Sequence, residues 1–173
     1  MKENIILIGF MGSGKTTVGK KIATSLGYSF LDTDELIVKR AGMEITDIFE
    51  TQGETAFRKM ESELLKELNA TVTHAVISTG GGLPLRKENA QLLRTLGLVN
   101  YLKVTKEVVL KRLKGDTSRP LLAGENVEEK IEQLLTSRDS VYQSVCHIEI
   151  NAENGTPEQV AERVISNFNK NIL

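Results

Sequence analysis

The chain has 173 residues, of which 40% are hydrophobic and 26% are charged, a balance typical of one ordinary globular domain. Its formal net charge is only −1 and it has no tryptophan, which argues against a protein that binds nucleic-acid backbones or stacks their bases. One cysteine excludes an internal disulfide, and no stretch has the length and apolar character of a membrane span, so we expect a cytoplasmic monomer without nucleic-acid or membrane partners.

Short apolar runs alternate along the chain with amphipathic stretches, a pattern that predicts strands alternating with helices. We expect strands over residues 4–8, 28–31, 75–77, 98–104 and 146–150. Helical periodicity runs through residues 15–26, 36–37, 45–49, 54–68, 108–113 and 128–142, and again from about residue 156. Such alternation predicts one α/β domain over residues 1–173, with three layers and a parallel sheet of about five strands. Its ligands should gather at the carboxyl ends of the strands.

A glycine-rich loop, Gly9-Phe10-Met11-Gly12-Ser13-Gly14-Lys15-Thr16, fits the P-loop pattern G-x-x-x-x-G-K-[ST] between a predicted strand and a predicted helix. The backbone N–H groups of such a loop and the helix N-terminus stabilise a polyphosphate. Lys15 can reach the β- and γ-phosphates, and the Thr16 hydroxyl can ligate Mg²⁺. The flanking elements disfavour the alternative of a plain turn with an incidental lysine. We expect ATP to contact Gly12, Ser13, Gly14, Lys15, Thr16 and Thr17.

Two carboxylates, Asp32 and Asp34, follow the second predicted strand at the same edge of the sheet as the P-loop. One can hold Mg²⁺, and the other can orient an attacking hydroxyl or accept its proton. In an extended turn, residues two apart point the same way, so both can face one cavity. The alternative is that one of them caps the helix that begins near Glu35, and the two roles are compatible.

Further motifs accompany these carboxylates. They are Phe57-Arg58-Lys59-Met60-Glu61, Ser78-Thr79-Gly80-Gly81-Gly82, Arg119-Pro120-Leu121-Leu122, and Arg138 with Tyr142. With the P-loop and the Asp-x-Asp turn, they make the chain resemble shikimate kinase from residue 4 to about residue 157. The strand before Gly80 lacks the terminal aspartate of a Walker B strand. Shikimate kinases share this departure, with Asp32 in the metal role.

The resemblance implies a P-loop kinase fold, and transfer of the ATP γ-phosphoryl group, with Mg²⁺, to the 3-hydroxyl of shikimate. The products would be shikimate 3-phosphate and ADP, on the route to chorismate and the aromatic amino acids. The implied catalytic residues are Lys15, Asp34 and Arg119. The implied shikimate-binding residues are Asp34, Arg58, Glu61, Gly80, Gly81, Gly82 and Arg138. Arg112 and Pro157 would flank the adenine, and residues 33–61 would form the acceptor-binding region.

The residue chemistry agrees with an acceptor that carries one carboxylate and several hydroxyls. Arg58 and Arg138 supply planar guanidinium groups suited to a carboxylate, and the glycine triplet allows close approach to the main chain. Each has a simpler alternative: a surface ion pair for Arg58 with its neighbouring glutamates, a strand-exit turn for the glycines, and a solvated helix face for Arg138.

The polar segment 114–124 contains Arg119 and is expected to be a lid loop that excludes water and delivers a cation to the phosphoryl group. Its alternative is a disordered surface loop without a catalytic role. For the whole chain, two other functions stay open, namely another small P-loop kinase such as a gluconate kinase, or a nucleotide-binding regulator without catalysis.

Overall fold

The computed structural model describes residues 2–114 and 126–172, so the expected lid loop with Arg119 falls outside the described residues, apart from its first residue. A sheet of five parallel strands lies at the centre, in the order β2-β3-β1-β4-β5. The strands are β1 (Ile5–Ile8), β2 (Ser29–Asp32), β3 (Ala75–Ser78), β4 (Leu98–Lys103) and β5 (Ile148–Asn151). This confirms the prediction of a parallel sheet of about five strands.

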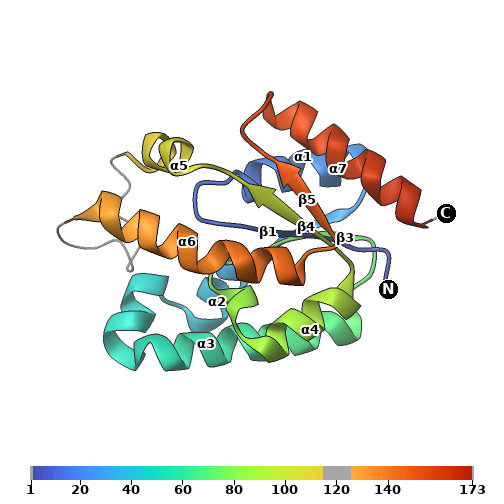
Figure 1. Cartoon of the computed structure of the whole chain (residues 1–173). Coiled ribbons are helices and arrows are strands. Elements are labelled where there is room, and N and C mark those ends of the chain that lie inside the picture. The colour runs from blue at the N-terminus through green and yellow to red at the C-terminus, as the bar shows by residue number, and fades with distance from the viewer. Residues whose placement is uncertain (1, 115–125, 173) are drawn as a thin grey trace.

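Helices cover both faces of the sheet (Figure 1). The α-helices are α1 (Lys15–Leu26), α2 (Thr33–Ala41), α3 (Ile45–Thr71), α4 (Lys87–Leu96), α5 (Lys106–Leu113), α6 (Val127–Val145) and α7 (Pro157–Ile172). Helices α1 and α7 pack together on one face, and α3, α4 and α6 lie on the other. The result is the expected three-layer α/β/α arrangement. None of the helices in the described ranges is long and apolar enough to span a bilayer.

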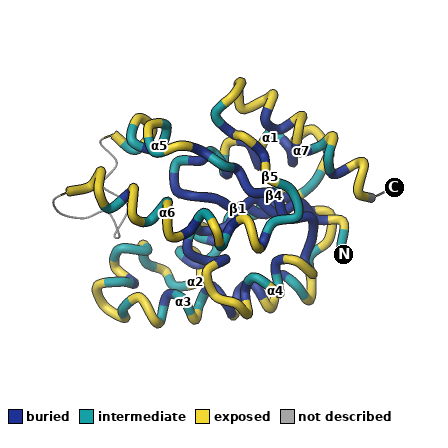
Figure 2. Tube along the Cα trace, viewed as in Figure 1, coloured by how far each residue is buried: buried dark blue, intermediate teal, exposed yellow. Residues whose placement is uncertain are grey.

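The core lies where the two helical layers meet the sheet, and Figure 2 shows the strands as a buried centre beneath helices with exposed outer faces. All residues of β1 and β3 are buried. Their near-continuous apolar sequences follow from this, because a parallel sheet covered on both faces has no solvent side. Each fully buried aliphatic side chain contributes about 1.5–3 kcal/mol.

The sequence missed two elements and misplaced the boundaries of others. It assigned nothing to the 3₁₀ helix η1 (Leu83–Leu85) or to α4, whose Leu93 and Leu96 are buried. The last strand begins at Ile148, later than predicted, because α6 continues to Val145. Predicted helical segments on either side of Gly53 form one element, α3, with a kink where Gly53 has φ 84°.

The register of the strands brings three loops to one edge of the sheet. Asp32 at the end of β2 pairs with Ser78 of β3, and Ser78 pairs with Leu7 of β1. The P-loop follows β1 directly, and the glycine triplet follows β3. Residues that are distant in sequence therefore meet at the carboxyl ends of neighbouring strands, where parallel α/β sheets bind ligands.

Candidate active site

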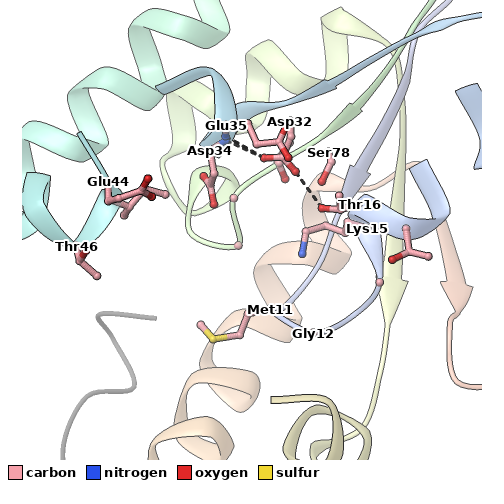
Figure 3. A pocket seen from close by; sticks show the side chains of 16 residues that line it. Met11, Gly12, Lys15, Thr16, Asp32, Asp34, Glu35, Glu44, Thr46 and Ser78 are labelled. Atoms are coloured by element: carbon pink, nitrogen blue, oxygen red, sulfur yellow. Dashed lines mark hydrogen bonds between the residues drawn. The ribbon is translucent and has the colours of Figure 1, made fainter. Parts of the chain in front are cut away.

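A cavity of about 560 Å³ opens at this edge of the sheet. Figure 3 shows Lys15 and Thr16 on one side of it, with Glu44 and Thr46 across from them. The predicted site residues that line it are Gly12, Gly14, Lys15, Thr16, Thr17, Asp32, Asp34, Gly80 and Gly81. The lining residues that sequence reasoning did not single out are Met11, Glu35, Glu44, Ile45, Thr46, Ser78 and Thr79. Glu44, Ile45 and Thr46 belong to no motif, although they fall within the expected acceptor-binding region.

The P-loop is held in shape by glycine conformations and by its own lysine. Gly12 and Gly14 have φ values of 76° and 92°, which side chains other than glycine rarely adopt. Lys15 is buried, and its Nζ donates hydrogen bonds to the carbonyls of Gly9 at 2.8 Å and Phe10 at 2.9 Å. The loop therefore carries a cation at its centre before any phosphate binds.

Thr16 and Asp32 lie beside each other, as a shared magnesium site requires. The Thr16 hydroxyl donates to Asp32 Oδ2 at 3.0 Å (Figure 3). Asp32 Oδ1 accepts from the backbone N–H groups of Asp34 and Glu35 at 3.0 and 3.3 Å, so Asp32 also caps α2. Asp32 is thus the N-cap of a helix that already begins at Thr33. The expectation of an extended turn from Asp32 to Asp34 is wrong, although both side chains line the cavity.

These oxygen donors fit Mg²⁺, which commonly takes one or two protein oxygens and completes its shell with phosphate and water. No group of three or more histidine, cysteine or acidic side chains within residues 2–114 and 126–172 could hold a metal ion. A metal held by Thr16 and Asp32 would complete its shell with water or phosphate oxygens.

Two carboxyl groups converge on Gly80. A Cβ atom added to Gly80 would lie 2.5 Å from Asp34 Oδ1 and 3.2 Å from Glu61 Oε1. The absence of a side chain at Gly80 therefore leaves the space that Asp34 occupies. Glu61 is completely buried in α3, and burial raises its pKa to about 7, while the charge of Arg58 acts in the opposite direction.

Arg58 joins this group through Glu61 rather than as a surface ion pair. Its Nη1 donates to Glu61 Oε2 at 2.9 Å, and the side chains are only 14% and 1% exposed. The second partner, Glu54, at 3.2 Å, is exposed. A Cβ atom on Gly82 would overlap the guanidinium group of Arg58. Arg58 thus forms the exposed ion pair with Glu54 that the alternative expects, but it also has a buried partner in Glu61 and a contact with Gly82.

Arg138 approaches the glycine triplet from α6. It is only 5% exposed, and its guanidinium lies over the ring of Phe10, 5.7 Å from the centroid. A Cβ atom on Gly81 would lie 3.6 Å from Arg138 Nη1. Arg138 is therefore not on a solvated helix face. Its guanidinium lies against Gly81, and that of Arg58 lies against Gly82.

Arg58, Glu61, Gly82 and Arg138 lie behind Gly80 and Gly81 and do not line the cavity themselves, and the other predicted residues in the described part also fall outside its lining. Ser13 is buried inside the P-loop. Arg112 is exposed on α5, and its Nη1 donates to the Gly12 carbonyl at 2.9 Å, so it borders the P-loop. Pro157 is the exposed first residue of α7. Arg119 lies outside the described residues.

A P-loop after β1, carboxylates at the end of β2 and two arginines, one buried and one partly buried, around a glycine triplet after β3 define a P-loop kinase of a small molecule. The profile of the shikimate kinase family matches residues 11–169. The shikimate kinase of Thermodesulfovibrio yellowstonii is 46% identical over 97% of this chain and 96% of its own length. The chain belongs to the shikimate kinase family.

Solved structures agree with this assignment. A shikimate kinase from Acinetobacter baumannii in complex with shikimate superposes with a TM-score of 0.95 and 39% identity, covering 100% of this chain and 96% of that one. A gluconokinase from Sinorhizobium meliloti gives a TM-score of 0.58 and 15% identity, covering 98% and 93% of the two chains, a likeness of fold alone. The gluconate alternative therefore has no support beyond the shared fold.

Proposed function

We propose that this chain is a shikimate kinase that transfers the γ-phosphoryl group of ATP to the 3-hydroxyl of shikimate, giving shikimate 3-phosphate and ADP. The observation that carries the proposal is the pair of arginines, the buried Arg138 and the partly buried Arg58, against the glycines beside Asp34. The family membership and the shikimate complex of the Acinetobacter relative support the choice of acceptor. The product would enter the route to chorismate and the aromatic amino acids.

The acceptor half of the site would hold shikimate by its carboxylate and hydroxyls. Arg58 and Arg138 would bind the carboxylate, since guanidinium groups present paired N–H donors to such an anion. Glu61 would keep Arg58 in place through the 2.9 Å hydrogen bond. Gly80, Gly81 and Gly82 would let the ring approach the main chain. Asp34 would then lie beside the ring, where it can contact the hydroxyl that attacks.

The donor half would hold ATP in the P-loop, with the N–H groups of Gly12–Thr17 around its phosphates. Lys15 would exchange its bonds to the Gly9 and Phe10 carbonyls for phosphate oxygens. Thr16 and Asp32 would hold Mg²⁺, which supplies charge neutralisation for the phosphates when bound. Arg112 and Pro157 would flank the adenine.

In the transfer step, the 3-hydroxyl oxygen forms a bond to the γ-phosphorus while the bond from that phosphorus to the β,γ-bridging oxygen breaks. The electron pair of the broken bond leaves with ADP. Asp34 orients the hydroxyl and accepts its proton. Lys15 stabilises the negative charge on the transferring group, since its ammonium is already fixed at the centre of the loop.

Product analysis tests the proposal. Phosphorus NMR of a reaction with MgATP and shikimate should give ADP and one phosphate monoester, coupled to the proton at carbon 3 of the ring. ADP accompanied by inorganic phosphate alone would reject the transfer and indicate an ATPase. The further proposals are that residues 1–173 form one domain and that the protein is a cytoplasmic monomer. Light scattering in solution tests the monomer, which should give the mass of one chain.

A further inference from the structure

Tyr142 of α6 is a buried residue whose hydroxyl reaches the acceptor half of the site. Its side chain is 0% exposed, and its Oη donates to the Gly81 carbonyl at 2.6 Å. The two residues are 61 positions apart in sequence, so this bond joins α6 to the loop after β3. Burial raises the pKa of Tyr142 to about 12, although the charge of Arg138 lowers it, so the hydroxyl remains protonated at neutral pH.

Gly81 is the point where three parts of the site meet. A Cβ atom placed on it would lie 3.5 Å from the Gly9 carbonyl oxygen of the P-loop, 3.5 Å from Tyr142 Oη and 3.6 Å from Arg138 Nη1. The position of the Gly81 backbone thus depends on both the donor half and α6. The hydroxyl of Tyr142 bonds directly to it.

The peptide held by Tyr142 lies between the two arginines. Arg138 lies against Gly81, and Arg58 lies against Gly82. Because the peptide unit is planar, tying the Gly81 carbonyl toward Tyr142 turns the N–H of Gly82 the opposite way. One hydrogen bond therefore fixes the orientation of the backbone that separates the two guanidinium groups.

A second buried tyrosine supports the ring of Tyr142 from behind. The rings of Tyr101 and Tyr142 have centroids 5.1 Å apart, and Tyr101 is 1% exposed. The Tyr101 hydroxyl donates to Asp139 Oδ1 at 2.7 Å. The two tyrosines are thus matched in burial, but the hydroxyl of Tyr142 bonds to Gly81 of the glycine triplet and to Arg138, whereas the hydroxyl of Tyr101 bonds to Asp139.

We propose that Tyr142 is a positioning residue that sets the spacing of Arg58 and Arg138 through the Gly81–Gly82 peptide, and so sets the affinity for the carboxylate of the acceptor. This inference rests on the proposed function. In this proposal, Tyr142 acts through Gly81 and does not touch the acceptor itself. We expect a larger effect on the acceptor than on the nucleotide, because the Tyr142 hydroxyl bonds to Gly81 and to Arg138, which both belong to the acceptor half.

The test compares Tyr142→Phe with Tyr101→Phe, each of which removes one buried hydroxyl and keeps the ring. We expect Tyr142→Phe to raise the KM and the calorimetric Kd for shikimate about tenfold, equivalent to about 1.4 kcal/mol, because the Gly81 carbonyl loses its partner. The KM for ATP should change less than about twofold. Tyr101→Phe should leave both KM values within that range, and both variants should lower the melting temperature.

Two outcomes would overturn the inference: a shikimate KM unchanged in Tyr142→Phe, or equal rises in the KM values for both substrates. Wild-type protein that does not phosphorylate shikimate would reject the proposed function instead.

If Tyr142→Phe fails to fold, 3-fluorotyrosine at position 142 keeps the hydroxyl, and its fluorine resonance should shift when shikimate is added without nucleotide. A label at Tyr28, which packs against His74 and Phe168, should not shift. A resonance at position 142 that ignores shikimate would contradict the inference.

Discussion

Glu61 is completely buried in α3 and accepts a hydrogen bond from Arg58, one turn earlier, at 2.9 Å. A carboxyl group so far from water would be costly to ionise without a cation beside it. Arg58 therefore both neutralises Glu61 and is held by it, with its guanidinium against Gly82. The two residues act as one unit of the acceptor site.

The ionisation of Glu61 should make stability depend on pH. Its pKa in the folded protein is raised from the ordinary 4.5 to about 7, so the folded state binds the proton more tightly than the unfolded state. The proton on Glu61 therefore stabilises the fold fully below pH 4.5. As the pH rises from 4.5 to about 7, the free energy of unfolding falls by about 3 kcal/mol in total.

Glu61→Gln isolates this effect, because the amide keeps the shape and cannot ionise. Urea unfolding of both proteins between pH 5 and 8 should show the variant becoming more stable relative to the wild type as the pH rises. A difference in unfolding free energy that stays constant over this range would mean that Glu61 does not titrate there.

The substitution Arg58→Ala should chiefly weaken binding of the acceptor. We expect the KM for shikimate to rise about 10- to 100-fold, since a charged hydrogen-bonding group is lost, with the KM for ATP little changed. Arg40→Ala is the matched control, because Arg40 forms an exposed ion pair with Glu67 at 2.7 Å, whereas Arg58 pairs with the buried Glu61 and lies against Gly82. It should leave both values unchanged. An unaltered KM for shikimate in Arg58→Ala would show that Arg58 does not bind the acceptor.

Gly80→Ala should impair the chemistry more than the fold. The added methyl group would come within 2.5 Å of Asp34 Oδ1, so Asp34 must move. We expect kcat to fall by about 100-fold or more, as for the loss of a general base, while circular dichroism stays native. The kcat of Gly81→Ala should fall less, because the added methyl group would meet its neighbours at ordinary distances of 3.5 Å or more. Equal losses in the two variants would argue against a clash with Asp34 as the cause.

Protonation of His147 should destabilise the protein in acid. Its Nδ1 accepts a hydrogen bond from the Val99 N–H at 2.9 Å, which requires an unprotonated nitrogen. Burial, with the charge of Arg94, lowers its pKa, so the unfolded state binds the proton more readily. Stability should therefore fall as the pH drops below about 6.5. Thermal melts of His147→Asn should show a weaker fall in acid than those of the wild type. Identical acid slopes in the wild type and His147→Asn would refute this role.

Local signals predict the P-loop and the helix that follows it. The P-loop and the bounds of α1, Lys15 to Leu26, follow from a motif and a periodicity that lie within a few consecutive residues. The sequence predicts that Asp32 and Asp34 face one cavity, and both line it, but the predicted extended turn between them is wrong. The cap formed by Asp32 starts α2 immediately, and Asp34 reaches the cavity from the first turn of a helix.

The acceptor half depends on packing that no local pattern contains. The sequence offers Arg58 two glutamate partners at helical spacing, and only the packing of α3 makes Glu61 buried and Glu54 exposed. Glu44 and Thr46 reach the cavity because the N-terminal end of α3 lies across it from the P-loop (Figure 3). The Tyr142–Gly81 bond joins residues 61 positions apart, so sequence could supply the residues and not their contact.

The most direct measurement of the central claim is ADP release, followed by a coupled assay, during titration with shikimate, with gluconate, and with a shikimate analogue that lacks the carboxylate. We expect saturable release with shikimate, little with gluconate, and a much higher KM for the analogue. Lys15→Ala and Asp34→Ala should be folded and inactive. ADP release that does not depend on shikimate, or that responds to gluconate in its place, would contradict the account.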